Sequence, residues 1–584
     1  MRVVVLLCFA GLALRLVVVQ GLSGGRYSAF GAAEVTTTVS VPAPRGTVYD
    51  RNGAVLAVSV PTSTVVGDPE LITHPAREAA ALAPLLGVDG GTLSAQLSKH
   101  SGYVVLARQV DDATTKKVEA LRLAGINTLP SSKRVDPADG LASAVIGATN
   151  AAGAGDSGLE YRYNTMLAGR SGTEQIQRTP DDVPLPGGGS GRPSTPGTGL
   201  ELTLDEPLQY VTEQSLAAEV VASHAKSGVA VVMDSHSGDI LAMANLVADP
   251  STGKVAQAPS NYAVTKVYEP GSVFKLVTFS AALQNGLVTP DQAFTVPNSL
   301  TIDGWVFHDA ENHPTERLTA TQILAQSSNL GTIEIAGLVG RDRLAAQIGA
   351  FGFGQPTGLG FPGESPGLVN VNPSSWPGSA MGSTPIGQND SVTAQQVLDM
   401  VNTVATGGTF VSPHLVRATV ASDGSVHAAR ASSTHRVLTP GITTELTTMM
   451  EQVVQDGTAV TAGIPGYTVA GKTGTAQVPD TAHGGYIPGA YMATFAGFAP
   501  AQNPVLSAVV VLEQPTPIFG GTVAAPVFAQ VMGYALHRYG VPTSGGPAAA
   551  AGTATPLPLG GGPSGPGTGT ATIGATAGTS TGTP

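Results

Sequence analysis

Three short motifs in this chain carry residue types that could perform chemistry together. In chain order they are Ser272-Val-Phe-Lys275, Ser327-Ser-Asn329 and Lys472-Thr-Gly-Thr475. They supply a nucleophilic hydroxyl with a lysine base beside it, a hydroxyl–carboxamide pair, and a cationic strand with a glycine gap. Acyl transfer through a serine ester needs this set of groups. Each motif alone is common by chance, but all three in this order and in matching structural contexts indicate such a site.

The first motif lies at the expected start of a buried helix. Pro270-Gly271 precedes Ser272, and Val273–Leu283 is apolar on nearly all sides up to the stop signal Asn285-Gly286. Free backbone N–H groups at a helix N-terminus favour developing negative charge. Lys275 lies one turn on, on the same face, and burial would lower its pKa enough for it to act as a base. Taken alone, this motif is more often an ordinary helix cap with an ion-paired lysine.

The second motif lies between two expected helices. Leu318–Ala325 and Leu330–Leu338 have helical patterns, so Ser327 and Asn329 would stand in the turn that joins them. Ser327 could relay a proton between the base and a leaving amine, and Asn329 could hold a substrate amide through its carboxamide. Taken alone, a helix–helix turn with polar caps explains these residues better.

The third motif lies in an expected strand. Tyr467–Ala470 leads in with strand character, and Ala476–Val478 continues the strand. Gly471 and Gly474 are unfavourable in one strand unless something must approach the backbone closely, and an extended peptide substrate is such a reason. A glycine-rich hairpin without function explains this pattern about equally well.

If the strand binds substrate, its polar groups have clear roles. Lys472, Thr473 and Thr475 would face a substrate carboxylate, and Gly474 would leave room for the substrate backbone. The backbone N–H of Thr475, with that of Ser272, could form an oxyanion hole. The candidate catalytic residues of the three motifs are Ser272, Lys275, Ser327, Asn329 and Lys472.

The composition excludes several classes of function. The chain has 584 residues, 42% hydrophobic and 12% charged, which is enough apolar material for two or three domains. Its formal net charge of −12 argues against a nucleic-acid partner, because phosphate binding needs a basic footprint. The single cysteine, Cys8, excludes an intrachain disulfide, and the 11 histidines lack zinc-type spacing. Since no Walker A loop or GxGxxG fingerprint occurs either, we expect no metal and no cofactor.

An apolar run opens the chain. Val3–Val19 is apolar except for Arg15. Such a run is an export signal or a membrane anchor, and this one is slightly shorter than the about 20 residues of a spanning helix. Because no Ala-x-Ala cleavage site follows, we expect residues 1–22 to form an uncleaved anchor. The near absence of a cytoplasmic flank leads us to expect a translation start upstream of Met1.

Residues 23–195 are expected to form a first folded region. The turn signal Asp50-Arg-Asn-Gly53 joins two β-type runs, and residues 76–100 and 112–124 have helical periodicity. The Pro/Gly/Ser-rich stretch 184–199 at the end of this region is either a linker or a long surface loop.

Residues 196–539 are expected to form a second region. Helices are predicted at 208–222 and 523–536, and strands at 228–233, 240–244, 494–499 and 505–512. Strands at both ends with helices between them indicate an α+β domain with an antiparallel sheet. Residues 540–584 contain no charged side chain and consist mainly of Gly, Ala, Thr and Pro, which predicts a disordered tail.

The chain resembles a class B penicillin-binding protein over nearly all of its length except the tail. Besides the three motifs, the stretches that carry the resemblance are Arg45-Gly-Thr-Val-Tyr-Asp-Arg-Asn-Gly53, Gly158-Leu-Glu160, Leu167–Gly172, Phe351-Gly-Phe-Gly354, Thr357-Gly-Leu-Gly360 and Phe498-Ala-Pro500. The first three resemble parts of the non-catalytic N-terminal module of that family. The other three resemble parts of its transpeptidase domain.

The resemblance implies a D,D-transpeptidase that cross-links peptidoglycan outside the membrane. Its α+β fold would combine a penicillin-binding/serine β-lactamase-like domain, with helices on both sides of an antiparallel sheet, an elongated N-terminal module and a membrane anchor. Ser272 would attack the D-Ala-D-Ala carbonyl of a stem peptide, expel the last D-Ala and pass the acyl group to a second strand's amine. β-Lactams would acylate Ser272 and stay.

The pattern looks most like the septal, cell-division type of this family. That type implies divisome and glycosyltransferase partners, and a single-pass protein of the cytoplasmic membrane with most of its chain outside. Two stretches depart from the family pattern: Gly387-Gln-Asn-Asp390 stands where Gly-Gln-Gly is usual, and Asp136-Pro-Ala-Asp139 replaces an aromatic-Pro turn.

Other functions compete with this interpretation. They are a lateral-wall class B transpeptidase, a serine β-lactamase, a D,D-carboxypeptidase, and a penicillin sensor or division scaffold without turnover. A β-lactamase would need a carboxylate to activate the deacylating water, and no Glu-x-x-Leu-Asn loop is found. Neither a β-lactamase nor a carboxypeptidase would need the segment Arg45–Gly53. Intact motifs argue against a pure scaffold.

Overall fold

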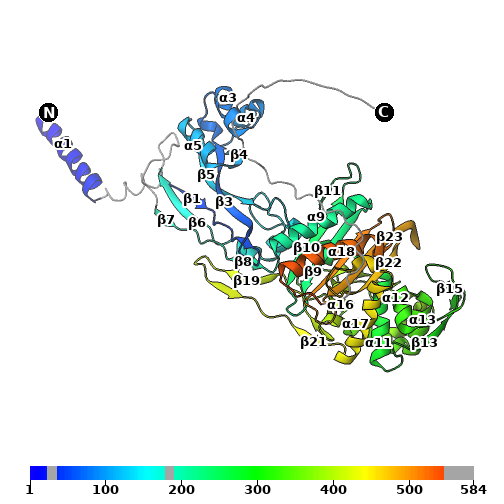
Figure 1. Cartoon of the computed structure of the whole chain (residues 1–584). Helices are drawn as coiled ribbons and strands as arrows, with labels where there is room; N and C mark the ends of the chain where they lie inside the picture. The colour runs from blue at the N-terminus through cyan, green and yellow to red at the C-terminus, as the bar shows by residue number, and fades with distance from the viewer. Residues whose placement is uncertain (23–35, 178–189, 545–584) are drawn as a thin grey trace, which may run out of the picture. The chain divides into compact units, whose positions relative to one another are not determined.

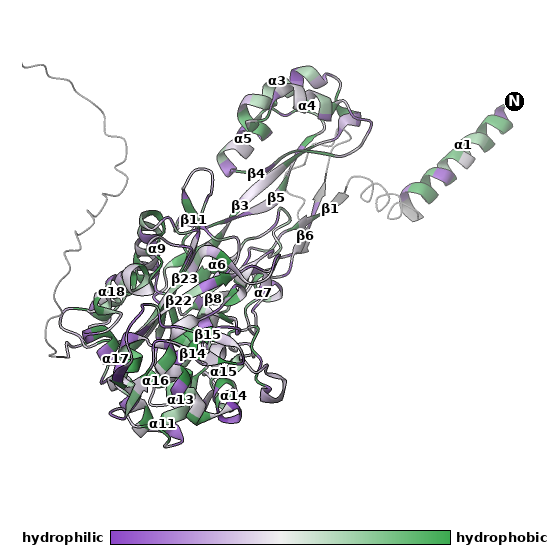
Figure 2. Ribbon diagram, turned by 90° about the vertical axis from the view of Figure 1, so that its right-hand side faces the viewer, coloured by the Kyte–Doolittle hydropathy of each residue, from purple (hydrophilic) through white to green (hydrophobic). Residues whose placement is uncertain are grey.

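The computed structural model describes residues 1–22, 36–177 and 190–544. Residues 178–189, which include the first part of the predicted linker or loop at 184–199, and residues 545–584, most of the predicted tail, lie outside the described residues. Helix α1 (Arg2–Val17) continues as the π-helical η1 (Val18–Leu22), and Figure 2 shows α1 as a largely hydrophobic helix. The helix Arg2–Gln20, with 19 residues, is long and apolar enough to cross a membrane, a test that a signal sequence also passes.

The first region is built around one long strand. This strand, β3 (Val55–Gly67), pairs antiparallel with β2 (Val48–Tyr49), β4 (Val104–Val110) and β5 (Ile126–Val135). The helices that pack beside these strands are α3 (Pro75–Leu86), α4 (Gly90–Leu97) and α5 (Asp112–Ala120), which Figure 1 shows grouped together. Buried side chains such as Val65, Leu82, Leu93 and Val118 give this part a small hydrophobic core of its own.

The helical periodicity predicted over residues 76–100 belongs to two helices, because local capping signals lie between them. Gly87 ends α3 in the left-handed conformation, with φ 65°. The Asp89 carboxylate then starts α4 by accepting the Thr92 N–H at 2.8 Å. A glycine C-cap followed by an aspartate N-cap stops one helix and starts the next. The helical periodicity alone did not show where one helix ends and the next begins.

A buried ion-pair cluster ties the start of the first region to its end. The Arg45 guanidinium donates to the Glu160 carboxylate at 2.5 Å and to the Asn164 carboxamide oxygen at 2.7 Å. Arg134 of β5 donates to the other oxygen of the Glu160 carboxylate at 2.8 Å. Arg45 and Glu160 are only 6% and 1% exposed, so each charge depends on its partner in place of water.

Short elements complete the first region. They are the sheet β1 (Thr36–Val41), β6 (Gly172–Gln177) and β7 (Ser190–Arg192), and the turns η2 (Pro69–Leu71), α6 (Ser143–Ile146), α7 (Gly158–Arg162) and α8 (Asn164–Leu167). The strands β2 to β5 described above belong to a seven-stranded sheet that also contains strands of the second region. Its order is β20 (Val426–Ala428), β19 (Val416–Val420), β8 (Gly199–Leu202), β2, β3 and β4, with β5 paired to β3.

The turn after β2 packs against the second region. Asp50 in this turn accepts the Glu206 N–H at 3.1 Å, at the start of α9 (Glu206–Ala222). Asp205 caps the same helix and accepts from Arg538 Nε at 2.8 Å and from the Tyr539 hydroxyl at 3.0 Å. The turn signal Asp50–Gly53 of the sequence therefore also makes a contact between the two regions.

The second region contains a six-stranded antiparallel sheet. Its order is β11 (Val255–Gln257), β10 (Ile240–Ala248), β9 (Ser227–Asp234), β24 (Leu506–Glu513), β23 (Tyr486–Ala499) and β22 (Ala470–Pro479). Strands from the two ends of the region, β9 and β24, are antiparallel neighbours, a pairing that the sequence did not specify. The strand predicted from Thr494 is longer than expected, since β23 begins at Tyr486.

The other elements of the second region are helices and short strand pairs. The helices and 3-10 turns are α10 (Tyr262–Thr265), η3 (Gly271–Phe274), α11 (Lys275–Gln284), α12 (Ala320–Gln326), α13 (Asn329–Val339), α14 (Arg341–Ala350), η4 (Pro373–Ser375), α15 (Ala380–Ser383), η5 (Thr384–Ile386), α16 (Ala394–Ala405), α17 (Pro440–Gln455), η6 (Val460–Ala462) and α18 (Gly520–Arg538). The strand pairs are β12 (Val267–Tyr268) with β17 (Val392–Thr393), β13 (Ala293–Val296) with β16 (Glu316–Thr319), β14 (Leu300–Ile302) with β15 (Trp305–Phe307), and β18 (Thr409–Val411) with β21 (Thr434–Arg436).

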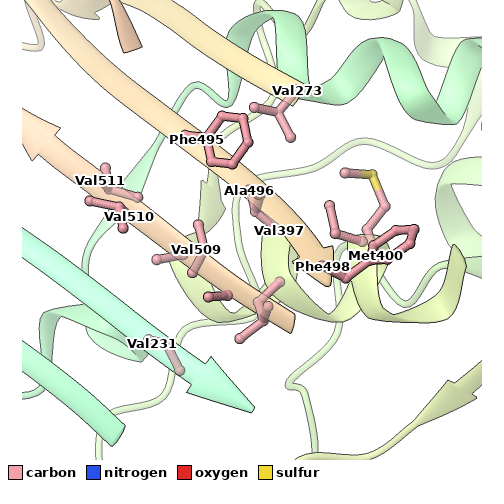
Figure 3. Packing of buried hydrophobic residues seen from close by; sticks show 14 of the residues in the cluster. Val231, Val273, Val397, Met400, Phe495, Ala496, Phe498, Val509, Val510 and Val511 are labelled. Atoms are coloured by element: carbon pink, nitrogen blue, oxygen red, sulfur yellow. The ribbon is translucent and has the colours of Figure 1, made fainter. Parts of the chain in front are cut away.

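Helices cover both faces of the six-stranded sheet. On one face, Ser507 of β24 donates to Asn402 of α16 at 2.8 Å, and Figure 3 shows the apolar packing of this helix beside β23 and β24. On the other face, the rings of Phe495 in β23 and Phe528 in α18 meet edge to face with centroids 4.7 Å apart. Alternate side chains of one strand point to opposite faces, so a single strand serves both layers. The predicted α+β arrangement is confirmed.

Two predicted boundaries near the motifs are wrong. Leu318 lies in β16, and α12 begins only at Ala320, after Thr319 forms a capping box that fixes the helix start. The lead-in strand predicted at Tyr467–Ala470 is absent except for its last residue, because β22 begins at Ala470. Both errors lie in the approaches to the motifs.

Candidate active site

Ser272 lies at the start of a helix, as the first motif predicts. It belongs to η3, which runs directly into α11. Gly271 in this turn has φ 56°, and its N–H donates to the Gly387 carbonyl oxygen at 3.0 Å. Ser272 is partly exposed, and no described residue forms a hydrogen bond with its hydroxyl. The hydroxyl is therefore free to meet a substrate.

Lys275 is fully buried one turn further on, at 0% exposure. Its Nζ donates to the Ser327 carbonyl oxygen at 2.5 Å and to the Asn329 carboxamide oxygen at 2.8 Å, and lies 3.4 Å from Ser327 Oγ. Burial lowers the pKa of Lys275 to about 7, although the Asp309 carboxylate acts in the opposite direction. With this pKa the amine is neutral for much of the time near pH 7, and so it can accept a proton.

Ser327 and Asn329 occupy the turn between α12 and α13, as predicted. Ser327 ends α12 with φ 62°, a left-handed conformation that is uncommon for serine, and Asn329 is the first residue of α13. Ser327 Oγ also accepts a hydrogen bond from Lys472 Nζ at 2.9 Å. The hydroxyl therefore lies between two lysine amines, where a proton relay would need it.

Lys472 is the second fully buried amine of the site, also at 0% exposure. Besides Ser327 Oγ, its Nζ contacts the carbonyl oxygen of Thr473 at 3.1 Å and Thr473 Oγ1 at 3.2 Å. Burial, followed by the positive charge of Lys275, holds the pKa of Lys472 well below its usual value. Two amines around one hydroxyl disfavour double protonation, because like charges repel strongly away from water.

The two glycines of β22 allow close packing inside the protein. A Cβ on Gly474 would lie 2.8 Å from the Pro270 carbonyl oxygen and 2.9 Å from a methyl group of Val273. A Cβ on Gly471 would lie 2.3 Å from the Phe495 ring. The glycine gap thus admits the turn that carries the nucleophile, a reason that the sequence did not suggest. Its predicted role of leaving room for a substrate stays a prediction.

The two threonines of the third motif differ in accessibility. Thr473 is 6% exposed, and its Oγ1 lies 2.7 Å from Thr458 Oγ1. Thr475 is partly exposed and its hydroxyl accepts the Gly520 N–H at 3.3 Å. The carbonyl group of Thr475 lies beside Gly271, since a Cβ on Gly271 would be 3.2 Å from the Thr475 carbonyl oxygen. The backbones of Thr475 and the Ser272 turn are therefore neighbours, as the predicted oxyanion hole requires.

The departure at Gly387–Asp390 places a residue with left-handed backbone where glycine is usual in the family pattern. Asn389 has φ 71°, a conformation that glycine adopts freely and that asparagine tolerates better than most residues. The Asn389 N–H donates to the Glu269 carboxylate at 3.0 Å, close to Ser272 in the chain. Glu269 also accepts from the Tyr486 hydroxyl at 3.0 Å. No sequence motif indicated Glu269 or Tyr486.

Asp309 is a further polar residue that sequence reasoning missed. It lies between β15 and β16 and accepts the backbone N–H groups of Asn329 and Leu330, the latter at 3.0 Å. The polar stretch His308–His313 around it gives no local signal of such a contact. Among the residues that the structure describes, no group of three or more His, Cys, Asp or Glu side chains could hold a metal ion.

Serine acyl transfer needs a reachable hydroxyl and a base. The arrangement offers a partly exposed serine one turn before a buried lysine, and a second lysine that bonds to the hydroxyl of Ser327. Residues 228–533 match the family described as the penicillin binding protein transpeptidase domain, and residues 40–202 match the penicillin-binding protein dimerisation domain. The chain belongs to the class B penicillin-binding proteins.

Individual relatives and solved structures are similar over most of the chain. Penicillin-binding protein PbpB of Mycolicibacterium smegmatis is 33% identical over 88% of this chain and 86% of its own length. Peptidoglycan D,D-transpeptidase FtsI of Escherichia coli is 31% identical over 86% of this chain and 84% of its own length. The crystal structure of penicillin-binding protein 3 from Mycobacterium tuberculosis, complexed with aztreonam, has a TM-score of 0.68 at 31% identity, over 87% of this chain and 99% of that one.

Proposed function

We propose that this protein is a peptidoglycan D,D-transpeptidase that cross-links stem peptides through an acyl ester of Ser272. The observation that carries the proposal is the cluster of Lys275, Ser327 and Lys472 behind the partly exposed serine. In this cluster the lysine nearest the nucleophile in sequence has a pKa of about 7. Similarity to FtsI, which is named as a peptidoglycan D,D-transpeptidase, supports the substrate class.

In the proposed acylation, neutral Lys275 takes the hydroxyl proton of Ser272 while Oγ attacks the carbonyl carbon between the two D-Ala residues. Backbone N–H groups of Ser272 and Thr475 would hold the oxyanion. The C–N bond then breaks, and Ser327 relays a proton from the lysine pair to the amine of the leaving D-Ala. Ser272 keeps the acyl group as an ester.

In the proposed second step, the amine of another stem peptide attacks the ester carbonyl carbon. It loses a proton to the lysine base, the bond to Ser272 Oγ breaks, and the serine hydroxyl is restored. Asn329 would align a stem-peptide amide, and Lys472, Thr473 and Thr475 would bind the donor carboxylate, with Gly474 leaving room for its backbone. A β-lactam would acylate Ser272 in the same way, and its leaving amine stays attached to the acyl group.

We infer four segments for the chain: a membrane anchor at 1–22, an N-terminal module at 23–195, a transpeptidase domain at 196–539 and a tail at 540–584. The apolar helix α1 fits a single-pass anchor in the cytoplasmic membrane, with the rest of the chain outside. Similarity to PbpB and FtsI supports the septal type, and thus divisome and glycosyltransferase proteins as partners.

The activity can be tested by labelling with a fluorescent penicillin. The wild-type chain should be labelled covalently, and Ser272→Ala should not. The matched control is Ser280→Ala, a buried serine of α11 whose hydroxyl donates to the Val277 carbonyl oxygen, and it should label like wild type. Equal labelling of Ser272→Ala would refute the proposal. With a donor stem peptide and an excess of acceptor amine, the cross-linked product is expected; release of the free acid alone would identify a carboxypeptidase or β-lactamase.

The septal assignment needs a separate test in cells. Depletion of the protein should block division and give filaments, because septal cross-links would be lost while side-wall growth continues. Rounded or stunted cells would instead identify the lateral-wall type.

A further inference from the structure

Asp309 collects an unusual number of donors for a residue in a loop. Its Oδ1 accepts the N–H groups of Asn329 and Leu330, the latter at 3.0 Å. Its Oδ2 accepts the hydroxyl of Ser328 at 2.7 Å and faces His313 Nε2 at 3.0 Å. The carboxylate thus binds three consecutive residues at the N-terminus of α13, a helix of 11 residues.

The loop that presents Asp309 is held on its other side. Asp309 closely follows the hairpin of β14 and β15, in which Leu300 pairs with Phe307. The Phe307 ring lies against Gly382 of α15, where a Cβ would meet the ring at 2.3 Å. The chain that leads into Asp309 is therefore anchored to α15 through this hairpin as well as to α13 through the carboxylate.

The contacts of Asn329 lead from Asp309 to the candidate base. The Asn329 backbone is bound by Asp309, and its Nδ2 donates to the carbonyl oxygen of His308 at 2.9 Å. Its Oδ1 then accepts from Lys275 Nζ at 2.8 Å. Since both the backbone and the amide nitrogen of Asn329 are held by His308 and Asp309, the position of its Oδ1 is set by this loop.

We propose that Asp309 is a positioning residue of the acylation step: it fixes the turn Ser328–Leu330 so that Asn329 holds the Lys275 amine beside Ser327. The proposal rests on the transpeptidase function inferred above. Asp309 touches neither substrate nor nucleophile in this account and acts only through Asn329 and through its charge. Its loss would leave Lys275 with one less fixed partner in a buried site.

The charge of Asp309 gives the proposal a second readout. The carboxylate raises the pKa of Lys275 against the larger lowering by burial. The other ionisable groups near this pair are Lys472, His313 and Glu316, which lies 3.2 Å from His313 Nδ1. The pKa of His313 is raised by its bond to the Pro314 carbonyl and by Asp309. Removal of the Asp309 charge would lower the pKa of Lys275. In a plot of the acylation rate constant against pH, the fall on the acidic side (the acidic limb) would therefore move to lower pH.

The test compares Asp309→Asn with wild type in the second-order rate constant of acylation by a fluorescent penicillin, from about pH 5 to about pH 9. The plateau rate should fall about tenfold or more, because the base is less well placed. The midpoint of the acidic limb should fall by roughly one pH unit. The matched control is Asp303→Asn, an exposed aspartate in the turn of the same hairpin, and it should leave both values unchanged.

A second variant separates positioning from charge. Ser328→Ala removes one donor to Asp309 but keeps the carboxylate, so the plateau should fall with no shift of the midpoint. Thermal unfolding of each variant shows whether it is folded. If Asp309→Asn does not fold, the proposal is tested with Ser328→Ala alone. Wild-type rates in either variant, or a slower Asp309→Asn with an unmoved midpoint, would overturn the proposal. Failure of the wild-type chain to react would instead refute the transpeptidase function.

Discussion

Acylation of Ser272 should depend on pH through Lys275. The base must be neutral to take the serine proton, and its pKa is about 7. Between about pH 8 and about pH 6, the neutral fraction of such a lysine falls from about nine tenths to about one tenth. The rate constant of acylation by a fluorescent penicillin should therefore fall about tenfold over this range. The direction follows from the role: a base loses activity as the pH falls.

The size of this effect comes from burial. A lysine in water has a pKa of 10.5, and near pH 7 only about one molecule in a few thousand would be neutral. Removal of Lys275 from water thus increases the neutral fraction by about three powers of ten. Without that shift, acylation would still be rising steeply well above pH 8.

The assay is a stopped-flow or quenched time course at constant ionic strength, with thermal unfolding at each pH to show that the fold persists. Lys275→Arg is the informative variant, because a guanidinium stays charged at every accessible pH. This variant should be acylated very slowly, and the rate constant that remains should not change around pH 7. A rate that is flat between pH 6 and pH 8, or a midpoint near that of a free lysine, would refute the assignment of Lys275 as the base.

Three other substitutions test the packing. Glu160→Gln leaves the buried Arg45 facing a neutral amide and should cost about 3 kcal/mol or more in denaturant unfolding of the full chain, with unchanged acylation. Gly474→Ala places a methyl group against Pro270 and should slow acylation about a hundredfold while the protein stays folded by circular dichroism. Asp399 has a pKa raised well above 3.8 by burial, so wild type loses stability as pH rises above that value. The free energy of unfolding of Asp399→Asn minus that of wild type should therefore increase as the pH rises. The increase should be about 1.4 kcal/mol per pH unit up to the folded-state pKa of Asp399.

The parts of the site that the sequence predicted are those with local causes. The helix that carries Lys275 follows from an apolar run with a stop signal, and the turn at Ser327 follows from two helical patterns separated by polar residues. Lys472 lies in a strand although two glycines weaken the strand pattern. In each case, the residues that decide the conformation lie within a few positions of the motif.

The parts that the sequence did not predict depend on contacts between distant segments. Asp309 and Glu269 belong to no sequence motif. The contact of Asp309 arises only when the segment after β15 meets α13, and that of Glu269 only when the loop at Asn389 meets the segment before η3. Gly474 was recognised as a gap, but the atoms that fill the gap come from Pro270 and Val273. A pattern can show that a space is needed, whereas only the fold shows what occupies it.

The two lysines of the site have different charged surroundings, which agrees with the different roles proposed for them. The Asp309 carboxylate raises the pKa of Lys275, whereas none of the causes that shift the pKa of Lys472 is a carboxylate. A substrate carboxylate held by Thr473 and Thr475 would provide the missing negative charge and stabilise the protonated form of Lys472. The positive charge so fixed would then lower the pKa of Lys275, because the two amines share Ser327 Oγ. Binding of the donor peptide would in this way keep the base neutral at the moment when Ser272 needs it.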